Sequence, residues 1–131
     1  MNSPGVGCGI AILRDNQLLL VQRLRAPEAG CWSFPGGKVD LFETSDAAAA
    51  RETAEELGIA VGPLQLLCLV DLIDRAGDTH WVSPVFLATE FKGEPRLLEP
   101  EKHGGLGWFA LDALPEPLSE AVRMAAQVLA R

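Results

Sequence analysis

Residues 37–59, GKVDLFETSDAAAARETAEELGI, decide the interpretation of this chain. Their apolar positions recur every three or four residues, a spacing that predicts an amphipathic helix. These positions are Ala47, Ala50, Ala54 and Leu57. Thr44 or Ser45 can cap the start of the helix, and Gly58 suits a left-handed C-cap. The sequence therefore predicts one helix that begins near residue 44 and ends before residue 58.

Three carboxylates lie along this helix. Glu52, Glu55 and Glu56 stand at positions i, i+3 and i+4, so we expect their side chains to project from one face. Like charges this close repel one another unless a cation lies between them, and hard divalent cations such as Mg²⁺ take oxygen ligands. A solvated acidic face is the alternative explanation for the three glutamates taken alone.

Together with its neighbours, the stretch resembles the signature motif of the Nudix hydrolases, G-x5-E-x7-R-E-U-x-E-E-x-G-U, where U is a bulky aliphatic residue. Eight of the nine defined positions match at the required spacing, and the exception is Thr53, a β-branched residue at the first U. The matching residues are Gly37, Glu43, Arg51, Glu52, Glu55, Glu56, Gly58 and Ile59. A looser similarity to MutT-like, nucleotide-cleaving members extends over most of the chain. The resemblance implies an α/β fold, a Nudix-type α/β/α sandwich with a mixed β-sheet, as a single domain over residues 1–131.

The resemblance also implies a metal site on the helix. The glutamates that match Glu52, Glu55 and Glu56 bind metal in the family, together with the backbone carbonyl of the glycine that matches Gly36. We expect Mg²⁺ as the cofactor, which Mn²⁺ can replace. Glu52 and Glu55 are our candidate catalytic residues, and Glu52 matches the general base of some MutT-like members.

Two further residues of the motif are expected to support the site. In the family, the arginine that matches Arg51 pairs with the first glutamate, here Glu43, and holds the loop against the helix. Such a pair orients the metal ligands and takes no part in the chemistry.

Outside the motif, the late loop of MutT-like members often supplies another carboxylate. Glu101 is our choice for that catalytic role, with Glu99 in reserve, and an ordinary charged loop is the alternative. Arg23 ends a predicted strand where related enzymes place an arginine that contacts phosphate. Gly37 has no side chain to obstruct the approach of a phosphate, so we expect it to bind substrate as well.

The remaining histidines and aromatic residues give weaker signals. His80 and His103 have no partners visible in the sequence, and we expect polar strand-end or loop residues, not catalysts. Trp32, Phe34 and Trp81 are expected to belong to the core, with stacking on a nucleobase as the alternative.

Composition limits the classes of function. The 131 residues carry a net charge of −7 and no basic stripe, which argues against duplex nucleic acid as a partner. No apolar run is long enough to span a membrane, and the first residues lack the features of a signal peptide. Three cysteines without metal-ligand spacing are expected to be reduced thiols of a cytoplasmic protein.

The rest of the chain predicts strands and one more helix. Residues 6–14 and 17–23 form a predicted β-hairpin around Asp15 and Asn16. We expect strands over 64–73 and 81–91, a loop over 93–107 with a short strand at 106–109, and a helix over 118–130. Residues 35–37 are expected to form a tight turn.

The leading hypothesis is metal-dependent hydrolysis of a small-molecule substrate, an NTP or dNTP, with oxidised nucleotides included. The products would be the nucleoside monophosphate and pyrophosphate. An ADP-ribose or nucleotide-sugar pyrophosphatase with the same helix is the first alternative, although the chain lacks the proline that ADP-ribose-cleaving members tend to carry about sixteen residues after the motif. The absence of any tyrosine argues against the dinucleoside polyphosphate group. A Nudix-fold nucleotide-binding module without catalysis is the second. A homodimer is left open.

Overall fold

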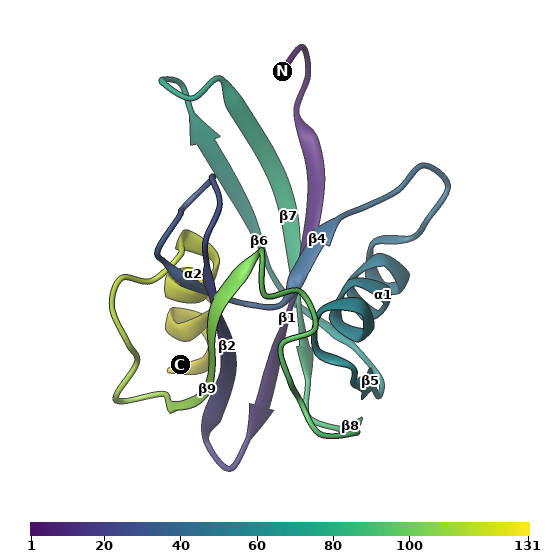
Figure 1. The fold of residues 1–131 in the computed structure, drawn as a ribbon, viewed down its shortest axis with the longest axis vertical. Helices are drawn as coiled ribbons and strands as arrows, with labels where there is room; N and C mark the ends of the chain where they lie inside the picture. The colour runs from purple at the N-terminus through teal and green to yellow at the C-terminus, as the bar shows by residue number, and fades with distance from the viewer.

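The computed structural model describes residues 1–131, which form nine strands and two helices (Figure 1). The strands are β1 (Gly5–Arg14), β2 (Gln17–Arg23), β3 (Trp32–Ser33), β4 (Gly36–Lys38), β5 (Ala60–Val61), β6 (Gln65–Asp74), β7 (Thr79–Ala88), β8 (Phe91–Lys92) and β9 (His103–Ala110). The helices are α1 (Ser45–Leu57) and α2 (Glu120–Leu129). Neither helix is long and apolar enough to cross a membrane.

Seven of the strands form one mixed sheet. Its main path runs β3-β2-β1-β7-β6, while β4 pairs with β1 and β9 pairs with β2. The β1–β7 pair is parallel and the other pairs are antiparallel. The two remaining short strands, β5 and β8, pair with each other. The predicted hairpin is confirmed, and Asp15 and Asn16 at its tip have positive φ angles of 52° and 62°, as a type I′ turn requires.

The two helices cover opposite faces of the sheet, so the predicted α/β/α sandwich is confirmed (Figure 1). On the α1 face, the buried cluster comprises Cys8, Ile10, Ile12, Leu19, Val21, Ala48, Ala49, Leu57, Ile59, Phe86 and Ala88. On the α2 face, it comprises Ala11, Leu18, Leu20, Phe34, Val70, Val85, Val122 and Ala125. Both clusters take residues from β1, β2 and β7, which therefore form the centre of the molecule.

Helix α1 ends as predicted but buries a different face. Gly58 has a φ of 72° and its N–H donates to the carbonyl of Ala54, which is a left-handed C-cap. The predicted apolar face was wrong except for Leu57, because the buried residues are Ala48, Ala49, Thr53, Glu56 and Leu57. Alanines occupy most of the first two turns, so their small side chains define no face clearly. Packing against β1 selects a face that includes a glutamate.

Several predicted boundaries also differ. Residues 36–38 form strand β4 on β1 and not a simple turn. The apolar run 81–91 is divided into β7 and β8. Strand β9 begins at His103, inside the range predicted as a loop, because pairing with β2 supplies a partner for a glycine-rich segment that has low strand propensity by itself.

Candidate active site

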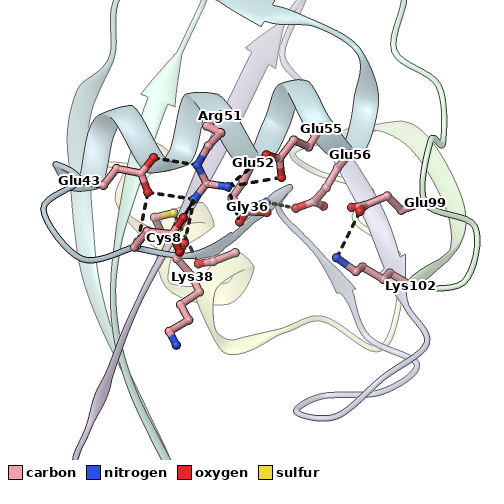
Figure 2. Close-up of polar contacts among 12 residues, drawn as sticks. Cys8, Gly36, Lys38, Glu43, Arg51, Glu52, Glu55, Glu56, Glu99 and Lys102 are labelled. Atoms are coloured by element: carbon pink, nitrogen blue, oxygen red, sulfur yellow. Dashed lines mark hydrogen bonds and ion pairs between the residues drawn. The ribbon is translucent and has the colours of Figure 1, made fainter.

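Arg51 connects the loop before α1 with the carboxylates on the helix (Figure 2). Its Nε and Nη2 atoms donate to the two carboxylate oxygens of Glu43 at 2.7 and 2.9 Å. Its Nη1 donates to Glu52 at 3.0 Å and to Glu55 at 3.3 Å, and Nη2 also donates to the Lys38 carbonyl at 3.2 Å. The hydrogen bonds that Glu43 accepts from Arg51, together with one from the Asp40 backbone N–H, lower the pKa of Glu43 to about 2. The pair that the resemblance implies is therefore present, and it fixes strand β4 against the helix.

The Glu52 carboxylate lies directly over Gly37. A Cβ atom at residue 37 would come within 2.5 Å of the Glu52 carboxyl carbon, so only glycine leaves room for this carboxylate. The Glu52 side chain is 15% exposed, and its burial raises the pKa of the carboxyl group, an effect that the Arg51 hydrogen bond opposes. Cys8 is paired with Gly37 in the neighbouring strand β1, and its thiol donates a hydrogen bond to the Gly37 carbonyl at 3.5 Å.

Glu56 is the most deeply buried of the three helix glutamates, with a side chain 4% exposed. Its Oε1 accepts a hydrogen bond from the Gly36 backbone N–H at 3.2 Å (Figure 2), whereas its Oε2 is buried without a hydrogen-bond partner. Burial is the main cause that raises the pKa of Glu56 to about 8; the neighbouring Glu52 and Glu99 contribute to the rise, and the Gly36 hydrogen bond opposes it. Gly36 is required sterically, because a Cβ atom there would lie 2.1 Å from the carbonyl oxygen of Cys8.

The three glutamates thus differ in environment although they share one side of the helix. The Glu55 side chain is 52% exposed, Glu52 is largely covered and Glu56 is buried. The i, i+3 and i+4 spacing of the three glutamates gives no sign that one carboxylate enters the core.

The segment that leads into β9 docks on the C-terminal end of α1. The Leu98 N–H donates to the Glu56 carbonyl at 2.9 Å and the Arg96 N–H donates to the Leu57 carbonyl at 3.1 Å. These bonds satisfy helix carbonyls that have no partner within the helix. They also fix the following residues close to the Glu56 side chain.

This docking brings Glu99, and not Glu101, toward the helix carboxylates (Figure 2). Glu99 accepts a hydrogen bond from Lys102 Nζ at 3.2 Å, and its other carboxylate oxygen is buried without a partner. Glu101 is exposed, because the turn closed by the Lys102 N–H and the Glu99 carbonyl places it on the outside. The structure therefore favours the reserve candidate for the loop carboxylate.

A cavity of about 340 Å³ opens beside the glycine strand, on the α2 side of the sheet. Its lining residues include an apolar wall of Phe34, Val70, Leu72, Trp81 and Val85. Polar and charged lining residues are Arg23, Glu28, Ser33, Lys38, Ser83 and Glu120, and the glycines are Gly7, Gly9, Gly36 and Gly37. The volume and the mixture of apolar walls with a few polar groups are typical of small-molecule sites.

Residues for which the sequence predicts different roles line the same cavity. Arg23 does line it, with its Nε donating to the Pro27 carbonyl at 2.7 Å. Phe34 and Trp81 line it, whereas Trp32 packs edge-on against Phe109.

Glu28 and Glu120 were missed as site residues. They meet because the Glu28 carboxylate accepts the backbone N–H of Glu120 at 2.8 Å. The residues are 92 positions apart, so no local spacing could have indicated this contact.

The carboxylates suit a hard divalent cation in their chemistry. Glu52, Glu55 and Glu56 offer oxygen ligands, and Glu56 Oε2 is a buried oxygen that no donor satisfies. No three histidine, cysteine, aspartate or glutamate side chains converge closely enough to hold a metal ion as they stand. Arg51 Nη1 holds Glu52 and Glu55, so these two carboxylates must turn from Arg51 to share a cation with Glu56.

Comparison with known proteins identifies similar chains. A family model described as NUDIX domain matches residues 3–130. The crystal structure of a MutT NUDIX hydrolase from Burkholderia pseudomallei is 57% identical, with a TM-score of 0.95, and the match covers 98% of this chain and 99% of that chain. An 8-oxo-dGTP diphosphatase from Proteus vulgaris is 38% identical over 92 residues, which cover 68% of this chain and 79% of that protein. An ADP-ribose pyrophosphatase from Methanocaldococcus jannaschii is 34% identical over 113 residues, or 86% of this chain and 66% of that protein, slightly less than two thirds of its length.

Proposed function

The chain belongs to the Nudix family, whose hydrolases act on nucleotide phosphoanhydrides, and from this premise we propose that it hydrolyses a nucleoside triphosphate. The substrate is an NTP or dNTP, with oxidised forms included, and the products are the nucleoside monophosphate and pyrophosphate. Residues 1–131 act as one catalytic domain.

One observation carries the proposal: the cavity and the carboxylate-bearing helix meet at the Gly36–Gly37 strand. Both glycines line the cavity, Gly36 donates to Glu56, and Gly37 lies against the Glu52 carboxylate. A nucleotide with its base in the cavity would place its phosphates along these glycines. The cations Arg23 and Lys38 line the same cavity and can contact the anionic chain.

Glu52, Glu55 and Glu56, with the backbone carbonyl of Gly36, would hold Mg²⁺, or Mn²⁺ in its place. When bound, the divalent cation polarises the phosphate and lowers the pKa of the attacking water. The oxygen of water forms a bond to the α- or β-phosphorus, and the bridging P–O bond breaks with its electron pair on the leaving group.

The proton released by the attacking water passes to a carboxylate, for which Glu52 is our first candidate and Glu55 the second. The Glu43–Arg51 pair holds strand β4 against the helix that carries Glu52, and Glu99 supplies the additional carboxylate of the loop.

A second candidate function is hydrolysis of ADP-ribose. The similarity to the ADP-ribose pyrophosphatase of Methanocaldococcus jannaschii favours it, and the same helix would serve that reaction. The two candidates differ in the part of the substrate that the cavity would hold, since ADP-ribose carries a second sugar beyond its diphosphate.

A substrate panel tests the proposal. The full chain is incubated with Mg²⁺ and canonical dNTPs and NTPs, 8-oxo-dGTP, ADP-ribose or nucleotide sugars, and the products are separated by anion-exchange chromatography. Monophosphate and pyrophosphate from a subset of the triphosphates is the expected result, and it should disappear in Glu52→Gln and Glu55→Gln variants that remain folded. Cleavage of ADP-ribose alone would show that the substrate is ADP-ribose and not a nucleoside triphosphate. Turnover of no compound in the panel would favour a binding module.

A further inference from the structure

His103 reaches the active site through an irregularity in strand β9. Leu106 and Trp108 of this strand pack against the cluster under α1, whereas Phe109 packs against the cluster under α2. Because side chains alternate between the two faces of a strand, regular alternation would place residue 103 with Phe109 on the α2 face.

The register shift between β2 and β9 changes that orientation. Gln22 is paired with Gly105, and the next residue of β2, Arg23, is paired with His103, so Gly104 has no partner. One extra residue in a strand is a β-bulge, and it can redirect the neighbouring side chain to the other face. His103 accordingly lies on the α1 side, with its side chain 7% exposed and next to Glu56.

The contact involves the one oxygen of Glu56 that lacks a hydrogen-bond partner. His103 Nε2 lies 3.2 Å from Glu56 Oε2, within ion-pair distance but without a hydrogen bond as the two groups stand, while Glu56 Oε1 is already held by the Gly36 N–H. His103 Nδ1 is buried and has no partner either. The imidazole therefore has one nitrogen within reach of a polar group, and that group is the carboxylate.

We propose that His103 is a positioning residue for Glu56. The N–H at His103 Nε2 fixes the orientation of the Glu56 Oε2 atom. An oxygen of a carboxylate has two lone-pair directions, so Oε2 can accept from His103 and still face a divalent cation. Groups that orient a ligating side chain in this way strongly affect metal affinity. The inference rests on the metal role of Glu56 in the proposed function.

The test measures Mn²⁺ binding to the full chain without nucleotide, by electron paramagnetic resonance. His103→Leu should weaken Mn²⁺ affinity by about 10- to 100-fold, the range typical for lost support of a metal ligand. His103→Gln keeps an N–H donor at similar reach and should bind Mn²⁺ within about threefold of wild type. His80→Leu removes the other histidine and is the matched control, with wild-type affinity expected.

Either of two binding results overturns the inference. The first is a His103→Leu variant that keeps the wild-type affinity for Mn²⁺. The second is a His103→Gln variant that loses as much Mn²⁺ affinity as His103→Leu, which would indicate that His103 acts through packing and not through a hydrogen bond. A ¹⁵N NMR measurement of the wild-type imidazole decides the matter if the leucine variant does not fold. Hydrogen on Nε2 supports the proposal, and hydrogen on Nδ1 with a bare Nε2 refutes it.

The parallel variant Glu56→Gln separates this inference from the proposed function. If wild type binds Mn²⁺ and Glu56→Gln does not, Glu56 is a metal ligand, and the variants at residue 103 then test only the positioning role of His103. If wild type binds no Mn²⁺, the metal role falls first and the positioning role falls with it.

Discussion

Substitution of Gly37 by alanine should separate activity from stability. The added Cβ atom would lie 2.5 Å from the carboxyl carbon of Glu52 and 2.6 and 2.9 Å from its two oxygens. Carbon atoms in contact prefer about 3.5–4.0 Å, so the carboxylate must move by about 1 Å. The atoms that move are the end of a flexible side chain, and Gly37 has no positive φ angle that alanine would resist. The fold should therefore accept the change.

The displacement should be costly for the reaction. A shift of about 1 Å in a group that takes part in the chemistry can reduce the rate by about 10²-fold. At about 1.36 kcal/mol per tenfold, that reduction corresponds to about 2.7 kcal/mol in the activation free energy. We expect kcat to fall by this factor, while the midpoint of thermal unfolding stays within a few degrees of wild type.

Steady-state kinetics with Mg²⁺ and the best triphosphate of the panel, alongside thermal unfolding, provide the assay. Gly77→Ala is the matched control, because its Cβ atom would also crowd a flexible carboxylate, that of Asp74, in an exposed turn outside the cavity, and its kcat should be nearly unchanged. A Gly37→Ala enzyme with a kcat within about threefold of wild type would refute the reasoning, since Glu52 would then tolerate displacement or play no part in catalysis.

Three further predictions concern single residues. The Thr53 hydroxyl is buried without a hydrogen-bond partner, so Thr53→Val should raise the free energy of unfolding by about 1 kcal/mol. Thr53→Ser keeps the hydroxyl and loses only a methyl group, so it should lower the free energy of unfolding by about 1 kcal/mol. Urea titrations measure both changes. Glu43→Gln should reduce kcat less than Glu52→Gln, because Glu43 acts only through an arginine; the reverse order would contradict the supporting role. Glu99→Gln should reduce kcat/KM more than Glu101→Gln, because only Glu99 is turned toward the buried helix carboxylates, and equal effects would count against that assignment.

The helix, its cap and its carboxylates could be predicted because they depend on residues close together in the sequence. The motif specifies where Glu52, Glu55 and Glu56 lie on the helix, and Gly58 specifies where it ends. The rotation of the helix about its axis could not be predicted, since alanines give little contrast between one face and another. Contact with β4 and β1 determines this rotation, and it carries Glu56 into the core.

The loop carboxylate and the histidine could not be predicted for a different reason. Glu99 faces the helix because backbone hydrogen bonds join residues 96–98 to the end of α1, and His103 faces it because of the bulge at Gly104. Both depend on how two distant segments pair, which the identity of the residues does not reveal. A sequence that reads Glu-Pro-Glu-Lys-His gives no indication of which members turn inward.

The position of the cavity has a consequence for how such enzymes diversify. Its apolar wall comes from β6, β7 and Phe34 on the α2 side of the sheet, while the carboxylates of α1 lie on the other side, and the two adjoin at Gly36 and Gly37. In the proposed binding mode, exchanges in the wall would alter which base is accepted without disturbing the helix that carries the carboxylates. Selection can act on the two halves separately, so one hydrolytic motif can be inherited unchanged by lineages that have come to use different nucleotides.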